Sequence, residues 1–273
     1  MSSIVLSAGV RANLLQLQQT SDLISSTQTK LASGKRVNSA LDNAINFFTA
    51  QGLDTRANNL SNLLDTMSNG INTIQAANNG ITSITKLVQS AQALVSQAQQ
   101  ANNTTTQAAL STQFNSLLAQ IGQLAGDSGF NGVNLLAGNT LTVTMNETAT
   151  STVSVAGVDY INANASPLSI ANAANNWAGA SDITAAATAL SSALTSLSAV
   201  SQTLSSGLST VQIRQDFTKA TINTLQSGSA ALTLADSNQE GANLLALQTR
   251  QQLSSTALSL ASQADQNVLR LFR

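Results

Sequence analysis

The sequence predicts a mainly α-helical protein: a long antiparallel bundle of heptad-patterned helices with one small β-hairpin, plus terminal helices that form a coiled-coil-like pair. Three observations predict this class. Apolar residues recur every seven positions in the middle of the chain and near both ends, the spacing of a helical seam. A single segment alternates with the period of two that is typical of strands. Amphipathic helices are predicted at both ends of the chain, outside the two long central rows.

Two heptad rows mark the two longest helices. A helix over residues 53–98 would be a rod roughly 70 Å long at about 1.5 Å per residue. A partner of matching length is predicted over residues 183–232. Burial of each Leu, Ile or Val contributes about 1.5 to 3 kcal/mol, against about 0 to 1 for an exposed ion pair, so we expect this core seam to hold the bundle together. Its residues are Leu53, Leu60, Met67, Ile74, Ile81, Val88 and Val95 in the first helix and Leu190, Leu197, Leu204 and Val211 in the second.

Two Asn-Gly pairs, at residues 69–70 and 79–80, lie inside the first of these helices. Such pairs ordinarily indicate turns. The apolar row passes through both without a change of phase, so we expect one continuous helix.

The first segment of the chain is predicted to be an amphipathic helix of about 30 residues. Its apolar positions are Val10, Leu14, Leu17, Ile24 and Leu31, and their phase does not continue into the Leu53 row. Between the two helices we expect a joint over residues 33–43, where Gly34 ends one helix and Asn38, Ser39 or Asp42 caps the next. The joint residues are Gly34, Arg36, Asn38 and Asp42.

Three further elements complete the predicted bundle. A break over residues 102–106 precedes a second helix with Leu110, Phe114 and Ile121 on one face, and a connection this short indicates an antiparallel neighbour. Alternating apolar residues around a polar turn at 146–150 predict a hairpin within residues 141–158. A loop over residues 160–181 contains the single proline and the single tryptophan.

The final segment is predicted to be an amphipathic helix that packs on the first. Its row is expected to lie against Val10, Leu17, Ile24 and Leu31, with Ala264 at a close helix contact. We therefore expect three parts: residues 1–43, the bundle of residues 44–237, and residues 238–273. The row comprises Leu253, Leu260, Ala264, Val268 and Leu271.

Composition excludes several classes of function. The net charge is -1 with 8% charged residues, so no basic footprint for nucleic acid is present. Histidine and cysteine are missing, which removes the usual metal ligands and the groups that titrate near neutrality. Asp236 and Glu240 could pair as carboxylates, but helix capping is the plainer interpretation. We expect no cofactor, no enzyme activity, no Sec signal peptide and no membrane span, because no apolar run approaches about 18 residues.

Four motifs in order resemble the bacterial flagellins. The chain has S-G-K-R-V-N-S-A-L-D at 33–42, F-N-G-V-N-L-L at 130–136, A-D-x-x-x-E at 235–240 and Q-N-V-L-R-L-F-R at 266–273. They are similar to the family's S-G-x-R-I-N-S-A-x-D, F-N-G-x-x-L-L, A-D-x-x-x-E and Q-N-V-L-x-L-L. The resemblance covers nearly the whole chain.

The resemblance implies a secreted, extracellular filament protein for swimming motility. Such a subunit is exported unfolded through the flagellar type III apparatus with an export chaperone, and polymerises beneath a cap on the hook-associated proteins. The two terminal helices would pair to line an inner tube, which assigns the terminal rows named above to inner-tube assembly. With about 25 residues after the hairpin, this chain resembles a short form that lacks large outer domains.

Two alternatives remain open. A hook-filament junction protein shares the terminal helices, but the ending and the short middle favour the main subunit. A signalling hairpin like that of a chemoreceptor would also be a long heptad pair, yet such hairpins usually carry more charge. Flagellins that stimulate the flagellin-sensing Toll-like receptor have a Q-R-V-R-E-L patch. Residues 88–93 here lack both arginines, with Gln89 and Ala91 in their places, so weak recognition is expected.

Overall fold

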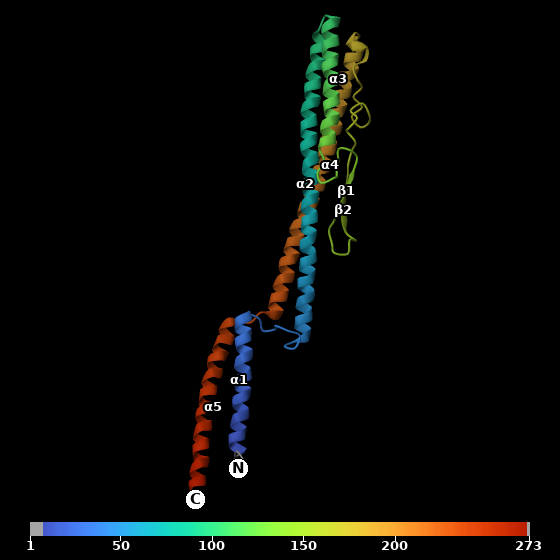
Figure 1. Ribbon diagram of the computed structural model, residues 1–273. Helices are drawn as coiled ribbons and strands as arrows, with labels where there is room; N and C mark the ends of the chain where they lie inside the picture. Colours follow the sequence, from blue (N-terminus) through green and yellow to red (C-terminus); the bar gives the residue numbers. More distant parts are fainter. Residues whose placement is uncertain (1–7, 272–273) are drawn as a thin grey trace. The chain divides into compact units, whose positions relative to one another are not determined.

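The computed structural model describes the backbone of residues 8–271 and the side chains among them except at positions 265 and 268–271. This part of the chain is helical with one antiparallel hairpin (Figure 1). The helices and strands are α1 (Ala8–Ser33), α2 (Ala44–Gln100), α3 (Thr104–Asp127), β1 (Thr140–Thr144), β2 (Thr152–Ala156), the short 3-10 helix η1 (Ala174–Trp177), α4 (Ala180–Thr233) and α5 (Ser237–Leu271). The predicted fold class is confirmed.

The chain divides into two compact units. The terminal unit comprises Met1–Thr55 with Thr224–Arg273, and the central unit comprises Arg56–Asn223. The division falls inside α2 and α4, whereas the predicted three parts were separated at the joint and before α5.

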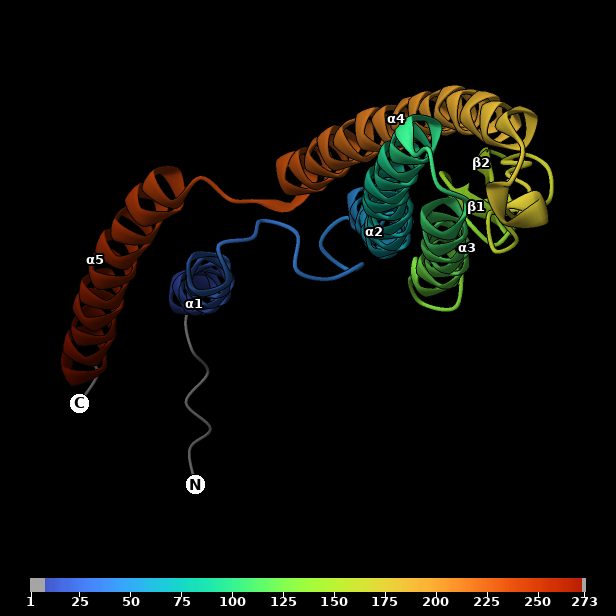
Figure 2. The same ribbon diagram turned by 90° about the horizontal axis from the view of Figure 1, so that it is seen from above.

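The core of the central unit is built from α2, α3, α4 and the hairpin. These helices lie side by side in Figures 1 and 2. The predicted core-seam residues are buried, except Leu53 of the terminal unit, which is half-buried. A hydrogen bond of 2.9 Å from Gln215 Nε2 to Ser68 Oγ also joins α4 to α2. The seam therefore packs as the heptad spacing predicts.

α2 continues through both Asn-Gly pairs, as predicted. The glycines have a packing role. A Cβ atom at Gly70 would lie 2.6 Å from Val143 of β1, and one at Gly80 would overlap Ser128 and come within 2.7 Å of Leu136. Glycine is needed at these positions because the hairpin and the segment after α3 approach the backbone of α2 closely.

α3 begins earlier than predicted. The side chain of Asn103 accepts a hydrogen bond of 2.7 Å from Thr105 N, and this N-cap places residues 104–106 in the first helical turn. The predicted break over residues 102–106 is therefore wrong in extent and is limited to residues 101–103.

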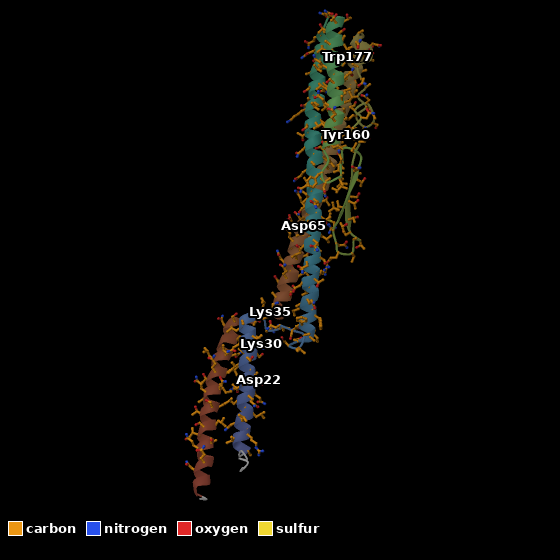
Figure 3. All side chains as sticks on the ribbon, in the orientation of Figure 1. Asp22, Lys30, Lys35, Asp65, Tyr160 and Trp177 are labelled. Carbon is orange, nitrogen blue, oxygen red and sulfur yellow. The ribbon has the colours of Figure 1, made fainter. Side chains whose placement is uncertain are left out.

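The segment between the hairpin and α4 supplies two large core residues. Tyr160 and Trp177, both labelled in Figure 3, are fully buried. The ring of Trp177 lies 4.9 Å from that of Phe114 of α3, and Ala173 N donates to Asn115 Oδ1 at 2.8 Å. Although predicted as a loop, this segment closes one side of the core.

The hairpin packs its apolar face on the helices. Leu141, Val143 and Val155 are buried, and the strands pair from Thr140 with Ala156 to Thr144 with Thr152. An ion pair of 2.8 Å between Arg56 Nε and Glu147 Oε1 joins the polar turn to α2. The hairpin thus has the helical support that a lone two-stranded sheet requires.

Hydroxyl side chains on the long helices satisfy themselves locally. Thr82, Ser90 and Ser96 of α2 and Thr184 and Thr203 of α4 each donate to the carbonyl four residues earlier, at 2.9 to 3.1 Å. These surfaces are polar but carry few charges.

α4 also contains an 18-residue window with a mean hydropathy of 1.4, which meets the length and composition of a membrane-crossing helix. Core helices of soluble proteins pass the same test. Because α4 carries the buried seam residues from Leu190 to Val211, the window is weak evidence for a membrane.

Candidate assembly surface

α1 and α5 pack against each other in the terminal unit. Val10 is 5% exposed, and Leu17 and Ile24 are half-buried on the same face. Thr20 and Thr27, three residues further along each time, are also buried. The α1 side of the contact is therefore a heptad seam in which one row is apolar and the other is hydroxyl-bearing.

The α5 side of this contact differs from the prediction. The half-buried positions alternate at steps of three and four residues, and are Leu244, Leu247, Gln251, Ser254, Leu258 and Ala261. Leu253 and Leu260 are 67% and 62% exposed, and Ala264 is exposed too. The prediction that their row packs on α1 within one chain is wrong. The side chains of Val268 and Leu271 lie outside the described residues.

Both terminal helices present apolar side chains to solvent beside their shared seam. We call these residues the terminal stripes: Leu14, Leu15, Leu23 and Leu31 on α1, which are 39% to 57% exposed, and Leu245, Leu253 and Leu260 on α5. The four leucines of α1 point in different directions around the helix, and exposed apolar side chains this numerous on two paired helices are typical of surfaces that contact other chains.

Backbone hydrogen bonds hold the joint, residues 33–43, against the end of α4. Gly34 takes a φ of +68° directly after α1, as expected for the residue that ends a helix. Arg36 N donates to Thr233 O at 2.8 Å, and Ala235 N donates to Gly34 O at 3.0 Å. The Arg36 guanidinium also donates to the carbonyls of Ala231 and Leu232, at 3.2 and 3.4 Å.

Arg36 therefore acts at the helix end as well as in the joint. Carbonyls in the last turn of a helix lack intrahelical partners and carry the negative end of the helix dipole. The cationic guanidinium satisfies two of them.

Asp42 organises the joint itself, and Asn43 rather than a predicted residue caps α2. Asp42 Oδ2 accepts hydrogen bonds of 2.9 Å from Ser39 N and Asn38 N, which hold the pKa of its carboxyl below the ordinary value. Asn43 Oδ1 accepts from Asn46 N at 2.9 Å. The prediction that Asn38, Ser39 or Asp42 caps α2 is wrong, because Asp42 is used in the preceding turn.

Asp236 has the capping role predicted for it. Its Oδ1 accepts from Asn238 N at 2.9 Å and from Gln239 N at 3.2 Å, at the start of α5. Among the side chains that the structure describes, no group of three acidic residues is arranged to hold a metal ion.

Three apolar side chains next to the joint are highly exposed. Leu41 is 97%, Ile45 is 80% and Phe48 is 60% exposed. Two parts of the terminal unit were not predicted from the sequence: the polar heptad row of α1 and these exposed residues near the joint. The seven-residue spacing of Asn13, Thr20 and Thr27 could have indicated the polar row.

Ala91, one of the two positions at which the resemblance predicts a missing arginine, is fully buried in the core of the central unit. The expectation of weak receptor recognition stays a prediction. Exposed Ser90 and half-buried Gln92 flank Ala91, and neither is charged.

Two family models match most of the chain. The bacterial flagellin N-terminal helical region matches residues 8–141, and the bacterial flagellin C-terminal helical region matches residues 181–272. Flagellin FljK of Caulobacter vibrioides is 32% identical over 282 residues, covering 100% of this chain and 99% of that protein. A flagellin of Brucella melitensis is 29% identical over 284 residues, with 100% of both chains covered. The crystal structure of Bacillus cereus flagellin matches 57% of this chain and 88% of that one, at 19% identity and a TM-score of 0.46.

Proposed function

The chain belongs to the bacterial flagellin family, and we propose how its terminal unit serves the family's polymer. It is a structural subunit of the bacterial flagellar filament, built from many copies of the chain. We propose that the terminal stripes are the surfaces through which copies contact one another along an inner tube. The observation that carries this proposal is the exposure of Leu253 and Leu260 beside an α1–α5 seam that is already filled.

The proposal divides the predicted inner-tube residues into two roles. Val10, Leu17 and Ile24 hold α1 on α5 within a protomer. The outward-facing residues contact neighbouring copies, where their burial is favourable by about 25 cal/mol per Å². Among the described side chains these are Leu14, Leu253, Leu260 and Ala264, together with Leu31, the last member of the Val10 row, which is 39% exposed. The proposal extends the assembly row to Val268 and Leu271, whose side chains lie outside the described residues.

The remaining expectations follow from membership of the family. The filament of this subunit is extracellular, and its subunits pass through the flagellar export apparatus with a chaperone, then assemble under the cap upon hook-associated proteins. The chain acts as a building block and not as an enzyme. Its lack of histidine and cysteine supports that view, because the usual general bases and thiolate nucleophiles are missing.

The test is seeded polymerisation of a charged variant. Leu260→Asp places a carboxylate where the proposal buries a leucine, and an unpaired buried charge costs several kcal/mol. We expect this variant to stay helical and monomeric and to fail to extend sonicated filament seeds, and Ala264→Asp to behave alike. The measurements are circular dichroism, light scattering and electron microscopy.

Ser262→Asp is the matched control. It adds the same charge two residues away, at an exposed position about 200° around the helix from Leu260 and about 100° from Leu245. It should extend seeds as the unmodified chain does. Normal filaments from Leu260→Asp would place this stripe in solvent and end the proposal.

A further inference from the structure

α4 presents two large apolar side chains away from the core of the central unit. Ile213 is 66% and Phe217 is 63% exposed, and their spacing of four residues puts them on one helix face. Val211 and Thr218, on the opposite face, are 0% and 3% exposed. We call Ile213 and Phe217 the α4 knob. No residue of the described chain covers it.

A hollow of matching size lies elsewhere on the same unit, between α2, the turn at Phe130–Val133 and β1. Its volume is about 200 Å³. An apolar cavity of about 150 Å³ accommodates benzene, so the hollow has room for one phenyl ring. Phe130, which is 37% exposed, offers an aromatic edge at its wall. The lining includes Thr66, Asn69, Gly70, Thr73, Phe130, Val133, Leu141 and Val143.

The charges beside the knob and the hollow that have no ion pair are opposite in sign. Asp216 and Lys219 also flank Phe217, but they pair with each other at 3.6 Å. Arg214 follows Ile213 directly, and Asp65, labelled on α2 in Figure 3, precedes Thr66 of the lining. Both side chains are exposed. Among the described residues, the ion pairs are Arg56 with Glu147 and Lys219 with Asp216, so neither Arg214 nor Asp65 has one.

An open filament requires contacts between two different surfaces of the subunit. A contact between identical surfaces closes into a dimer, whereas a heterologous contact leaves one free copy of each surface at the two ends and continues indefinitely. The knob and the hollow are such a pair, since they are separate surfaces of one compact unit, one protruding and the other concave, with opposite charges beside them.

We propose that the α4 knob of one copy inserts into the hollow of another copy, with Phe217 against Phe130 and Arg214 paired with Asp65. The proposal rests on the role of the chain as a filament subunit and adds a second contact to that of the terminal stripes. It commits the knob to a copy of this chain and to no other partner.

The chain contains no cysteine, so a single introduced thiol is unique. Thr210→Cys lies three residues before Ile213, and Thr66→Cys lies on the rim of the hollow; both positions are exposed. Each variant is polymerised alone and mixed with the other. Filaments are confirmed by electron microscopy and treated with a short bismaleimide. Covalent dimers are then separated on denaturing gels.

The control is Thr188→Cys mixed with Thr66→Cys. Thr188 is an exposed threonine on the same face of α4, 22 residues before Thr210 and thus roughly 33 Å away at 1.5 Å per residue. We expect strong dimer bands from the mixture of Thr210→Cys and Thr66→Cys, and only background from the control and from each variant alone. Filaments without dimers in the test mixture overturn the proposal while leaving the filament role intact.

A charge-reversal arm needs no thiol. Arg214→Glu and Asp65→Arg should each raise the critical concentration for assembly by about tenfold or more, because like charges then face each other. The double variant restores the ion pair with the two charges exchanged, so its critical concentration for assembly should be near that of the unmodified chain. Dimers within filaments of one cysteine variant, or no rescue by the double variant, would also overturn the proposal.

Discussion

Two glycines one turn apart in α3 should respond in opposite directions to the same substitution. Gly122 is buried, and a Cβ atom there would overlap the backbone carbonyl oxygen of Ile161. Gly126 is exposed, and a Cβ atom there would meet nothing within 4 Å. Gly122→Ala and Gly126→Ala thus isolate the effect of the close approach of residue 161 to α3.

The expected change in the free energy of unfolding follows from two opposing contributions. Alanine favours a helix interior over glycine by about 1 kcal/mol. Overpacking a filled site costs about 1 to 3 kcal/mol, and the upper part applies at Gly122 because a backbone carbonyl cannot rotate away as a side chain can. Gly122→Ala should therefore destabilise the protein by about 1 to 2 kcal/mol. Gly126→Ala, in the last turn, should stabilise it by about 0.5 kcal/mol.

The assay is chemical unfolding of the monomer, followed by the fluorescence of Trp177. This single tryptophan is fully buried against Phe114 of α3, so it reports directly on the affected region. In thermal unfolding, the loss at Gly122 corresponds to a fall of about 2 to 8 °C in Tm for a unit of 150 to 250 residues. A Gly122→Ala protein as stable as the unmodified chain would refute the reasoning.

Three further predictions concern separate parts of the central unit. Burial raises the pKa of the Tyr160 phenol, and the nearby Ser196 hydroxyl opposes this more weakly. Because Tyr160 Oη makes no hydrogen bond of ordinary geometry among the described residues, Tyr160→Phe should raise the free energy of unfolding by about 1 kcal/mol; a decrease would show that Ser196 is a true partner. A hydrogen bond from its own backbone N–H and the Arg56 guanidinium hold the pKa of Glu147 below its ordinary value. Ionised Glu147 therefore stabilises the fold at pH values above the ordinary pKa, and this stabilisation is lost as the pH falls through the lowered pKa. Arg56→Gln should reduce the difference in free energy of unfolding between about pH 7 and pH 3 by at most about 1 kcal/mol, because Arg56 is well exposed. A pH profile of stability identical to that of the unmodified chain would argue against the ion pair. Finally, residues 88–93 contain no arginine, so the monomer should stimulate the flagellin-sensing receptor weakly in reporter cells; potency equal to that of a flagellin with the Q-R-V-R patch would contradict this.

The long helices were predictable because a seven-residue period repeated many times determines both the helix and its buried face. Met67, Ile74 and Ile81 illustrate this, since each is nearly or fully buried. The Asn-Gly pairs were read correctly for the same reason, as a long apolar row outweighs two local turn signals.

The buried face of α5 could not be predicted from apolar spacing alone. Two stripes of leucines run along this helix, and the stripe that packs on α1 also contains Gln251 and Ser254. Counting apolar residues favoured the wrong stripe, because it gave no weight to the matching Thr20 and Thr27 of α1. A seam in which polar rows meet needs the pattern of both helices to be considered together.

The joint shows a second limit of local patterns. Several residues there have side chains suited to capping, and sequence alone does not say which turn each will cap. The role of Arg36 depends on carbonyls nearly 200 residues away in the chain, which no local pattern contains.

The hydroxyl-covered helices determine how the fold responds to the salt concentration of its surroundings. Dissolved salt acts on proteins chiefly by screening charges, and it weakens exposed ion pairs over distances of about 10 Å at 0.1 M. Here the long helices expose threonine and serine side chains whose hydroxyls donate hydrogen bonds to carbonyls of the same helix, as those of Thr82 and Thr203 do. With 8% charged residues, little of the fold depends on charge attraction. The same subunit should keep its structure from dilute fresh water to brine.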